Sequence, residues 1–409
     1  MTAQQPATAA GQTSPRGRAT VAVRQSSLRE SNLAALVAAV CASEVPPSRA
    51  DLAASLGITR ATASRLADEL VEAGLLDEVT REQVGPGRPA RPLVPGERVV
   101  ALGLSVDVDQ LLVRAVDLRG RLVAERAAPL PEGDAGAVLA GLAELARSVR
   151  QGLRGRIVVG SGVAVPGVVA DRRLLVRAPN LGWSEVDVPA HLPTVSGRRA
   201  VVGNEADLAA VVEAEPVPGR AGPWSDFVHV TARVGVGGAV VSGGQVVVGE
   251  HGAAGELGHV CVDPHGPRCP CGSTGCLERY AGLEALAAAS GLAPERVATD
   301  LGVRAAEGDP RCAEALAILS WSLSIALASV VNVVGISSVV LGGHLAQLEP
   351  FLHDDLAHRL QQRVLGSRWD PVRLRPALAD PGVAATGAAF LVLEDVITSP
   401  ATWLPTVRG

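Results

Sequence analysis

The stretch GELGHVCVDPHGPRCPCGSTGC, from Gly255 to Cys276, contains two histidines and four of the six cysteines of the chain. Glycines at 272 and 275 predict turns that let closely spaced cysteines approach one another. One imidazole and three thiolates form a donor set that suits tetrahedral zinc. The predicted metal ligands are His259, Cys269, Cys271 and Cys276.

Other interpretations of this stretch stay open at this point. The CxC step is atypical of zinc fingers, and Cys261 and His265 are near enough to compete as ligands. A disulfide is disfavoured in a reducing cytoplasm, and a redox pair would not need three cysteines. Four protein ligands leave no open position on the metal, so the pattern favours structural over catalytic zinc.

Composition limits the class of protein. A chain of 409 residues with 47% hydrophobic and 19% charged residues predicts two or three globular domains. All 37 basic residues are arginine, which excludes Schiff-base and Walker-type lysine chemistry. The net charge of −5 argues against a protein coated in nucleic acid. Residues 1–20 predict a disordered tail without a signal peptide, and no apolar run indicates a membrane span, so a cytoplasmic protein is expected.

Residues 21–97 predict a winged helix-turn-helix domain. A helix begins after Ser48 and turns at Gly57, and a second helix begins after Thr59 and ends near Gly74. The following segment, LLDEVTREQVGPGRPARPLV, predicts a hairpin that forms a wing. The residues expected to contact DNA are Arg60, Thr62, Ser64 and Arg65 on the second helix and Arg88 in the wing. A three-helix protein–protein module is the alternative.

From residue 98 onward, glycine-punctuated Val and Leu strands alternate with Ala-rich helices, as is typical of α/β proteins. Two similar segments each predict three consecutive strands, VVALGLSVDVDQLLVRAVDLRGRLVAER and FVHVTARVGVGGAVVSGGQVVVGE. They indicate two related lobes, at 98–224 and 225–409, with the last helix free to return to the first lobe. A ligand is expected in the cleft between them.

Several motifs, in order, resemble those of the ROK family of sugar kinases and sugar-responsive repressors. They are GVAVPGVV, APNLGW, VVGNEADLAA, HGAAGELGH, the GH followed by CxCGxxGCxE, and VVLGGH. The N-terminal RESNLAALVAAV and GRPARPL resemble the repressor branch of actinobacterial type. The resemblance implies two actin-like (ribonuclease H-like) lobes behind a winged helix-turn-helix, with sugar in the cleft and structural zinc.

The same resemblance implies a set of sugar-binding residues, Asn204, Glu205, Glu256, His259 and Glu278. Carboxylates and amides supply the acceptors and donors that vicinal hydroxyls need. His259 is expected to bind zinc through one ring nitrogen and sugar through the other. The alternative is that these polar residues are helix caps or surface groups.

The phosphate loops depart from the family pattern. Against a DxGxT loop the chain has SVDVD, with Ser105, Asp107 and Asp109 at the three fixed positions. Against a GTGxG loop it has RVGVGG from Arg233, and Glu205 replaces the catalytic aspartate. Carboxylates at a phosphate site repel the ligand. We therefore predict a cleft that senses sugar without phosphorylating it.

The sequence thus predicts a zinc-containing, sugar-responsive regulator, and most specifically a repressor of carbohydrate uptake or metabolism genes. Its partners would be double-stranded operator DNA, a sugar effector and further copies of itself in a dimer or tetramer. One alternative is an ATP-dependent sugar kinase with a fused DNA-binding domain. Another is a regulator whose body senses a protein partner.

Overall fold

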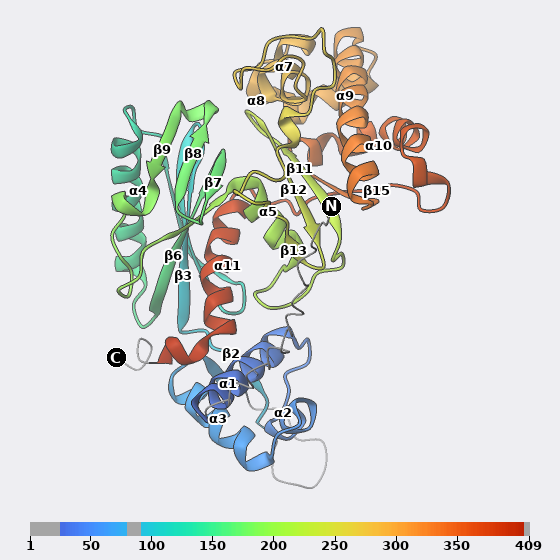
Figure 1. Cartoon of the computed structure of the whole chain (residues 1–409). Coiled ribbons are helices and arrows are strands. Elements are labelled where there is room, and N and C mark those ends of the chain that lie inside the picture. Colours follow the sequence, from blue (N-terminus) through green and yellow to red (C-terminus); the bar gives the residue numbers. More distant parts are fainter. Residues whose placement is uncertain (1–24, 80–90, 405–409) are drawn as a thin grey trace, which may run out of the picture.

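The computed structural model describes residues 25–79 and 91–404. The predicted tail at 1–20 and the tip of the predicted wing, including Arg88, lie outside these ranges. Within them the chain forms a small helical domain followed by two α/β lobes (Figure 1). The first long strand after the helical domain begins at Val99, next to the position where the sequence changes in texture.

The N-terminal domain has three helices, α1 (Gln25–Ala42), α2 (Arg49–Leu56) and α3 (Arg60–Glu72). Ser48 and Asp51 form a capping box at the start of α2, in which each side chain accepts the backbone N–H of the other. Gly57 ends α2 in the left-handed conformation, with φ 65°. The Thr59 side chain then accepts the N–H of Thr62 and begins α3. The predicted caps and turn are confirmed.

A short hairpin follows α3. Strand β1 (Leu76–Glu78) pairs antiparallel with β2 (Leu93–Pro95), as the wing prediction requires of its two arms. The Arg49 guanidinium, at the start of α2, contacts Glu78 on β1 and Asp68 on α3. These contacts fix the hairpin against the helix pair.

Lobe 1 is built on a five-stranded sheet in the order β10-β6-β3-β4-β5. The first predicted strand triplet forms the antiparallel part, and β6 and β10 run parallel to β3. A small sheet, β7-β8-β9, extends this lobe toward the cleft. The elements are β3 (Val99–Val106), β4 (Gln110–Asp117), β5 (Leu122–Pro129), α4 (Ala135–Gly152), β6 (Ile157–Val165), β7 (Val168–Ala170), β8 (Leu174–Ala178), η1 (Pro179–Leu181), β9 (Trp183–Asp187), η2 (Val188–His191), β10 (Val201–Asn204) and α5 (Glu205–Ala214).

Lobe 2 repeats the plan with the sheet order β13-β12-β11-β14-β15. The second predicted triplet forms its antiparallel part, although the third strand has only two residues. Helices α7 to α10 pack around one large core beside this sheet. The elements are β11 (Phe227–Ala232), β12 (Val236–Ser242), β13 (Gln245–Val246), η3 (Leu257–His259), α6 (Glu278–Ala281), α7 (Leu283–Ser290), α8 (Pro294–Ala306), α9 (Pro310–Val334), β14 (Ser338–Gly343), α10 (His344–Arg363), η4 (Leu365–Arg368) and β15 (Arg373–Pro376).

The last helix, α11 (Val383–Thr398), crosses back and packs on the lobe 1 sheet (Figure 1). It lies so close to β3 and β6 that a Cβ at Gly103 would be 1.7 Å from the Ala385 carbonyl oxygen. A Cβ at Gly162 would be 2.0 Å from the Ala388 oxygen. Glycine is therefore required at both positions for the helix to seat on the sheet.

Helix α11 also contacts the N-terminal helical domain. Leu33, Leu36 and Val37 of α1 share one buried core with Phe390 and Leu393 of α11. The final turn, η5 (Pro400–Thr402), and the fully buried Trp403 complete this core. Helix α11 therefore joins the sheet of lobe 1 to the N-terminal helices.

Helix α9 is 25 residues long and, among the described helices, alone has the length and apolar character to cross a membrane. The sequence did not suggest an apolar run of that length. Half of its most apolar window is buried inside the protein, where it packs against α7, α8 and α10. Burial in the lobe 2 core accounts for its hydropathy.

Candidate functional site: the cleft between the lobes

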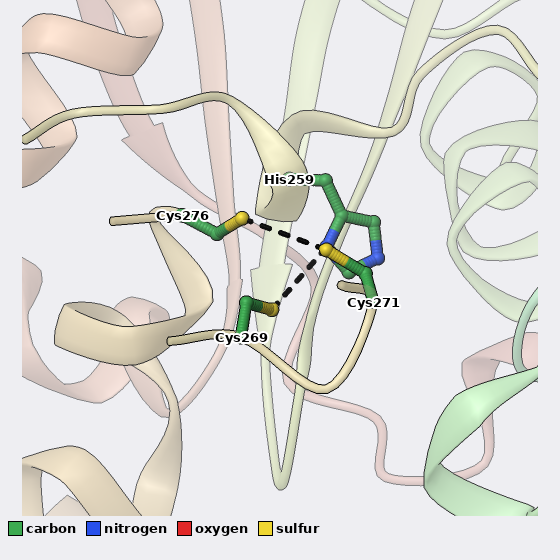
Figure 2. Close-up of side chains that lie close together, drawn as sticks. All are labelled: His259, Cys269, Cys271 and Cys276. Carbon is green, nitrogen blue, oxygen red and sulfur yellow. Dashed lines mark hydrogen bonds between the residues drawn. The ribbon is translucent and has the colours of Figure 1, made fainter. Parts of the chain in front are cut away.

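The four predicted metal ligands lie together at the cleft side of lobe 2 (Figure 2). One donor atom from each, on His259, Cys269, Cys271 and Cys276, lies within 4.8 Å of the others. The Cys269 sulfur is 3.9 Å from Nδ1 of His259, and the Cys271 and Cys276 sulfurs are 3.7 Å apart. Since a disulfide bond measures about 2.05 Å, these are separate thiols facing a common centre.

The local backbone explains this convergence. The segment folds back on itself through bridges that pair Cys261 with Cys276 and Arg268 with Thr274. The turns require glycine, because Gly275 has φ 64° and a Cβ there would be 1.6 Å from the Asp263 oxygen. The side chains of Cys261 and His265, the competing ligands considered from the sequence, are exposed and lie outside the four-atom cluster.

The electrostatics of the cluster fit a cation. Burial, reinforced by the neighbouring thiols, raises the pKa of Cys276 to about 12 and also raises that of Cys269. Burial acts on Cys271 as well, but hydrogen bonds from the Ser273 backbone and the two thiols lower its pKa. Three thiolates this close together need a positive charge between them. These residues can hold one metal ion with a closed set of four protein ligands.

Beside the cluster, a cavity of about 220 Å³ lies between the lobes. All five residues predicted to bind sugar line it: Asn204 and Glu205 from lobe 1, and Glu256, His259 and Glu278 from lobe 2. Cys271 of the metal cluster also borders it. The cavity is smaller than the roughly 300–1,000 Å³ of sites for drug-sized ligands, and its size suits a single sugar ring.

Asn204 and Glu205 stand where β10 passes into α5. The Asn204 Oδ1 accepts the N–H groups of Ala206 and Asp207 as the helix cap, and its Nδ2 donates to the Gly167 oxygen. Asn204 is therefore a helix cap, as the alternative interpretation of these polar residues predicted. One Nδ2 hydrogen remains to donate to a ligand. Burial, reinforced by the nearby Asp107 carboxylate, raises the pKa of Glu205 to about 7.

The lobe 2 side of the cavity is organised by the metal cluster. The Nδ1 of His259 faces the cysteines, and its Nε2 lies 3.9 Å from the Glu256 carboxylate at the cavity. Glu278 begins α6 directly after Cys276 and Leu277, and its carboxylate accepts the Val236 N–H at 3.2 Å. Two cavity-lining side chains are therefore attached directly to the cluster or to the chain next to it.

The predicted DNA-contacting residues lie on α3, with the exception of Arg88. The side chains of Arg60 and Arg65 are exposed, and neither forms an ion pair within the described part of the chain. Ala63, Leu66 and Leu70 face the core, as their spacing predicts. Thr62 and Ser64 are half-buried, and the Thr62 hydroxyl lies 2.9 Å from that of Thr59 at the helix cap.

A comparison with protein families matches residues 101–395 to the ROK family. The chain belongs to the ROK family. Residues 31–84 match a Crp-like helix-turn-helix domain, so this ROK protein carries a DNA-binding type of module at its N-terminus.

Relatives of this ROK protein include both regulators and enzymes. It is 25% identical to the xylose repressor of Bacillus spizizenii over 355 residues, covering 85% of this chain and 91% of the repressor. It is 34% identical to an N-acetylmannosamine kinase of Escherichia coli over 199 residues, covering 46% of this chain and 65% of the kinase. The match to the repressor extends over the N-terminal domain as well as the lobes.

Among solved structures, a ROK family transcriptional regulator described as a homolog of the Escherichia coli MLC protein has the same fold. Its TM-score is 0.74 at 23% identity, and the match covers 93% of this chain and all of that one. The predicted fold class, two actin-like lobes behind a helix-turn-helix, is confirmed.

Reasoning from the sequence missed part of the smaller interlobe cavity of this ROK protein. Arg177 on β8 of the small sheet and Asn180 in the following turn η1 also line it. A Cβ at Gly235 would be 2.6 Å from both the Asn180 amide nitrogen and the Glu278 carboxylate. Asn180 lies in the quoted APNLGW motif, so a signal for it existed; Arg177 had none.

A second cavity, of about 550 Å³, adjoins the first. It is lined by the two loops singled out in the sequence, SVDVD and RVGVGG, which face each other across the cleft. Arg233 of one loop forms an ion pair with Asp107 of the other, at 2.9 Å. Glu205 alone among the described residues lines both cavities.

Proposed function

We propose that this chain is a sugar-responsive transcriptional repressor of carbohydrate uptake or metabolism genes. Its interlobe cavity binds the sugar without phosphorylating it, and a structural zinc ion braces that cavity. The protein acts in the cytoplasm, where thiols stay reduced and are free to bind metal.

One observation carries the proposal: the cavity and the DNA-binding domain rest on the same helix. Helix α11 packs on β3 and β6 of the lobe that supplies Asn204 and Glu205, and it shares a buried core with α1. A sugar that favours one lobe arrangement therefore changes the support of α1 and, through it, the position of α3. The ligand needs differential affinity for two arrangements to do this.

The chemistry of the cavity supports a sugar as the effector. Three carboxylates, two amides, one imidazole and one guanidinium converge on a space of single-ring size. They can accept and donate hydrogen bonds to several hydroxyls at once. The xylose repressors among the relatives make xylose the first sugar to test.

Zinc suits the cluster of one imidazole and three thiols better than harder cations, which prefer oxygen ligands. His259 would hold the metal through Nδ1 and leave Nε2 for the sugar, so the metal fixes the orientation of the ring. Metal analysis of the purified chain is expected to give about one ion per chain, as a single four-ligand site requires.

The deciding experiment measures fluorescence anisotropy of labelled DNA from the protein's own upstream region. The protein is titrated alone and with a panel of sugars, xylose first, in the absence of ATP. Tight binding that one sugar abolishes or strengthens supports both halves of the proposal. A two-half-site operator is expected, because repressors of this type bind as symmetric homo-oligomers.

Two other outcomes would redirect the proposal. Tight DNA binding that no sugar changes would indicate a protein partner or a phosphorylated effector, and calorimetry with the sugar panel would test that reading. Binding no tighter than to random DNA would contradict a regulator.

A sugar kinase is the second candidate, favoured by the 34% identity to an N-acetylmannosamine kinase. A coupled assay of ADP release across common sugars, including N-acetylmannosamine, decides between them. We expect no sugar-dependent ADP release, because the carboxylates of Asp107 and Asp109 occupy one of the two loops that face the larger cavity.

A further inference from the structure

The larger cavity in the cleft differs in charge from a phosphate-binding site. Six carboxyl groups line it, against one lining guanidinium, that of Arg233. Two of the six, Glu213 and Asp380, pair with arginines outside the lining, which leaves four carboxyl groups against Arg233. His229 and His344 also line it, but burial lowers the pKa of each to about 4, so both are neutral near pH 7. The carboxyl groups belong to Asp107, Asp109, Glu205, Glu213, Glu295 and Asp380.

The single cation of this cavity is already paired. Arg233 contacts Asp107 at 2.9 Å, and its Nη1 also donates to the Pro381 carbonyl oxygen at 3.3 Å. The Asp107 side chain is only 14% exposed, and its other carboxylate oxygen accepts the Val108 N–H at 2.7 Å. An incoming phosphate would have to break this pair and then face the freed carboxylate.

The pair also joins the two lobes. Asp107 lies on the turn between β3 and β4 of lobe 1, whereas Arg233 lies on the turn between β11 and β12 of lobe 2. The Arg233 backbone is held by hydrogen bonds to Gly235 and Leu283, and Pro381 directly precedes the α11 segment. The guanidinium therefore spans the cleft from a fixed position.

The pair stands directly behind the sugar cavity. Glu205, which lines both cavities, interacts electrostatically with Asp107 and with Arg233. A sugar in the smaller cavity would therefore have this carboxylate and the ion pair at its inner end.

We propose that the Asp107–Arg233 ion pair determines ligand specificity, excluding nucleotide phosphates from the larger cavity and joining the lobes directly behind the sugar. The cleft then closes on a sugar without a bound nucleotide. This inference rests on the proposed function and deepens it, since it explains how a fold shared with kinases responds to sugar without a nucleotide.

The test is calorimetric titration of the full chain with MgATP. The wild type is expected to show no measurable binding. Asp107→Gly combined with Arg233→Gly is expected to bind MgATP measurably, at least about tenfold more tightly than the detection limit that bounds the wild type, because like-charge contacts and a competing ion pair are both removed. The matched control removes an ion pair whose residues line neither cavity, Arg173→Gln with Asp187→Asn, and should not bind MgATP.

MgATP binding by the wild type, or no gain in a folded double variant, would overturn the proposal. If the glycine variant does not fold by circular dichroism, Asp107→Asn with Arg233→Gln replaces it under the same criteria. The charge-swapped variant, Asp107→Arg with Arg233→Asp, should restore thermal stability lost in either single variant while still excluding MgATP. Operator binding of the wild type, measured separately, tests the proposed function independently of these titrations.

Discussion

The cleft and α3, the proposed recognition helix, are two sites of opposite construction. The cleft gathers residues from segments more than a hundred positions apart, and two of them, His259 and Glu278, belong to or directly follow a cluster of one imidazole and three thiols. The recognition helix α3 presents Arg60 and Arg65 from one short exposed segment that two capping residues and a glycine define. The comparison teaches that the first site depends on tertiary structure, whereas the second depends mainly on local sequence.

The largest expected effect comes from removing a metal ligand. Cys276→Ala should abolish metal binding, lower the thermal stability of the chain and reduce sugar affinity, because His259 and Glu278 lose their common anchor. The loss of metal affinity should exceed the roughly 10–100-fold loss that follows removal of an outer partner of a metal site. Metal content, thermal unfolding and calorimetry with the effector sugar measure the three effects.

Cys312→Ala is the matched control, because that cysteine is equally buried but lies in α9 outside the cluster. It should keep the metal and the sugar affinity. If Cys276→Ala also keeps both, the cluster is not a brace for the cavity, and the contrast between the two sites is lost.

The second prediction concerns the recognition helix. Arg60→Ala combined with Arg65→Ala should weaken operator binding by about 10–100-fold, as expected for loss of arginine contacts to base edges or phosphates. Sugar affinity should not change, because neither residue lines the cavity. The assay is DNA anisotropy at fixed salt, since electrostatic binding depends on it.

The control here replaces two exposed arginines of lobe 1, Arg126→Ala with Arg154→Ala. It removes the same charge from another surface. Equal loss of DNA affinity in both variants would mean that α3 contributes only to the overall charge.

The contrast also explains what could be predicted from sequence. The caps Ser48 and Thr59 and the turn at Gly57 act through neighbours within four residues, so the helix pair could be predicted closely. The cysteine spacing limited the metal ligands to a few choices, and the fold selected among them. Asn180 and Arg177 were missed because they enter the cavity only through the packing of a small sheet.

The ion pair in the larger cavity shows the same limit of prediction from sequence. Asp107 and Arg233 each departed visibly from a loop pattern, which predicted a poor phosphate site. That they neutralise each other is a property of two turns on different lobes, and no local signal contains it.

The third prediction concerns pH. The pKa of Glu205 is raised to about 7, so near neutral pH its carboxyl is only partly ionised. Since an ionised acceptor binds hydroxyls more strongly, sugar affinity should rise about fivefold as pH increases from about 6 to about 8. Glu205→Gln should remove this rise.

Asp207→Asn is the matched control, because burial raises the pKa of Asp207 to about 7 as well, yet that residue does not line the sugar cavity. It should leave the pH dependence of sugar affinity intact. For both carboxyls the pKa is higher in the folded state, so each contributes stability at low pH that is lost as pH rises to about 7. In thermal unfolding, either variant should therefore lose less stability than the wild type as the pH rises to about 7.

The smallest expected effect comes from the cap of the recognition helix. Thr59→Ala removes the hydroxyl that accepts the Thr62 N–H, and an N-cap of this kind contributes about 0.5–2 kcal/mol. The free energy of unfolding should fall by about 1 kcal/mol, and operator affinity should fall by less than in the double arginine variant. Thr59→Ser should restore both, since serine caps equally well. A loss of sugar affinity in Thr59→Ala would show that the two sites are coupled even without DNA, through the core that α1 shares with α11.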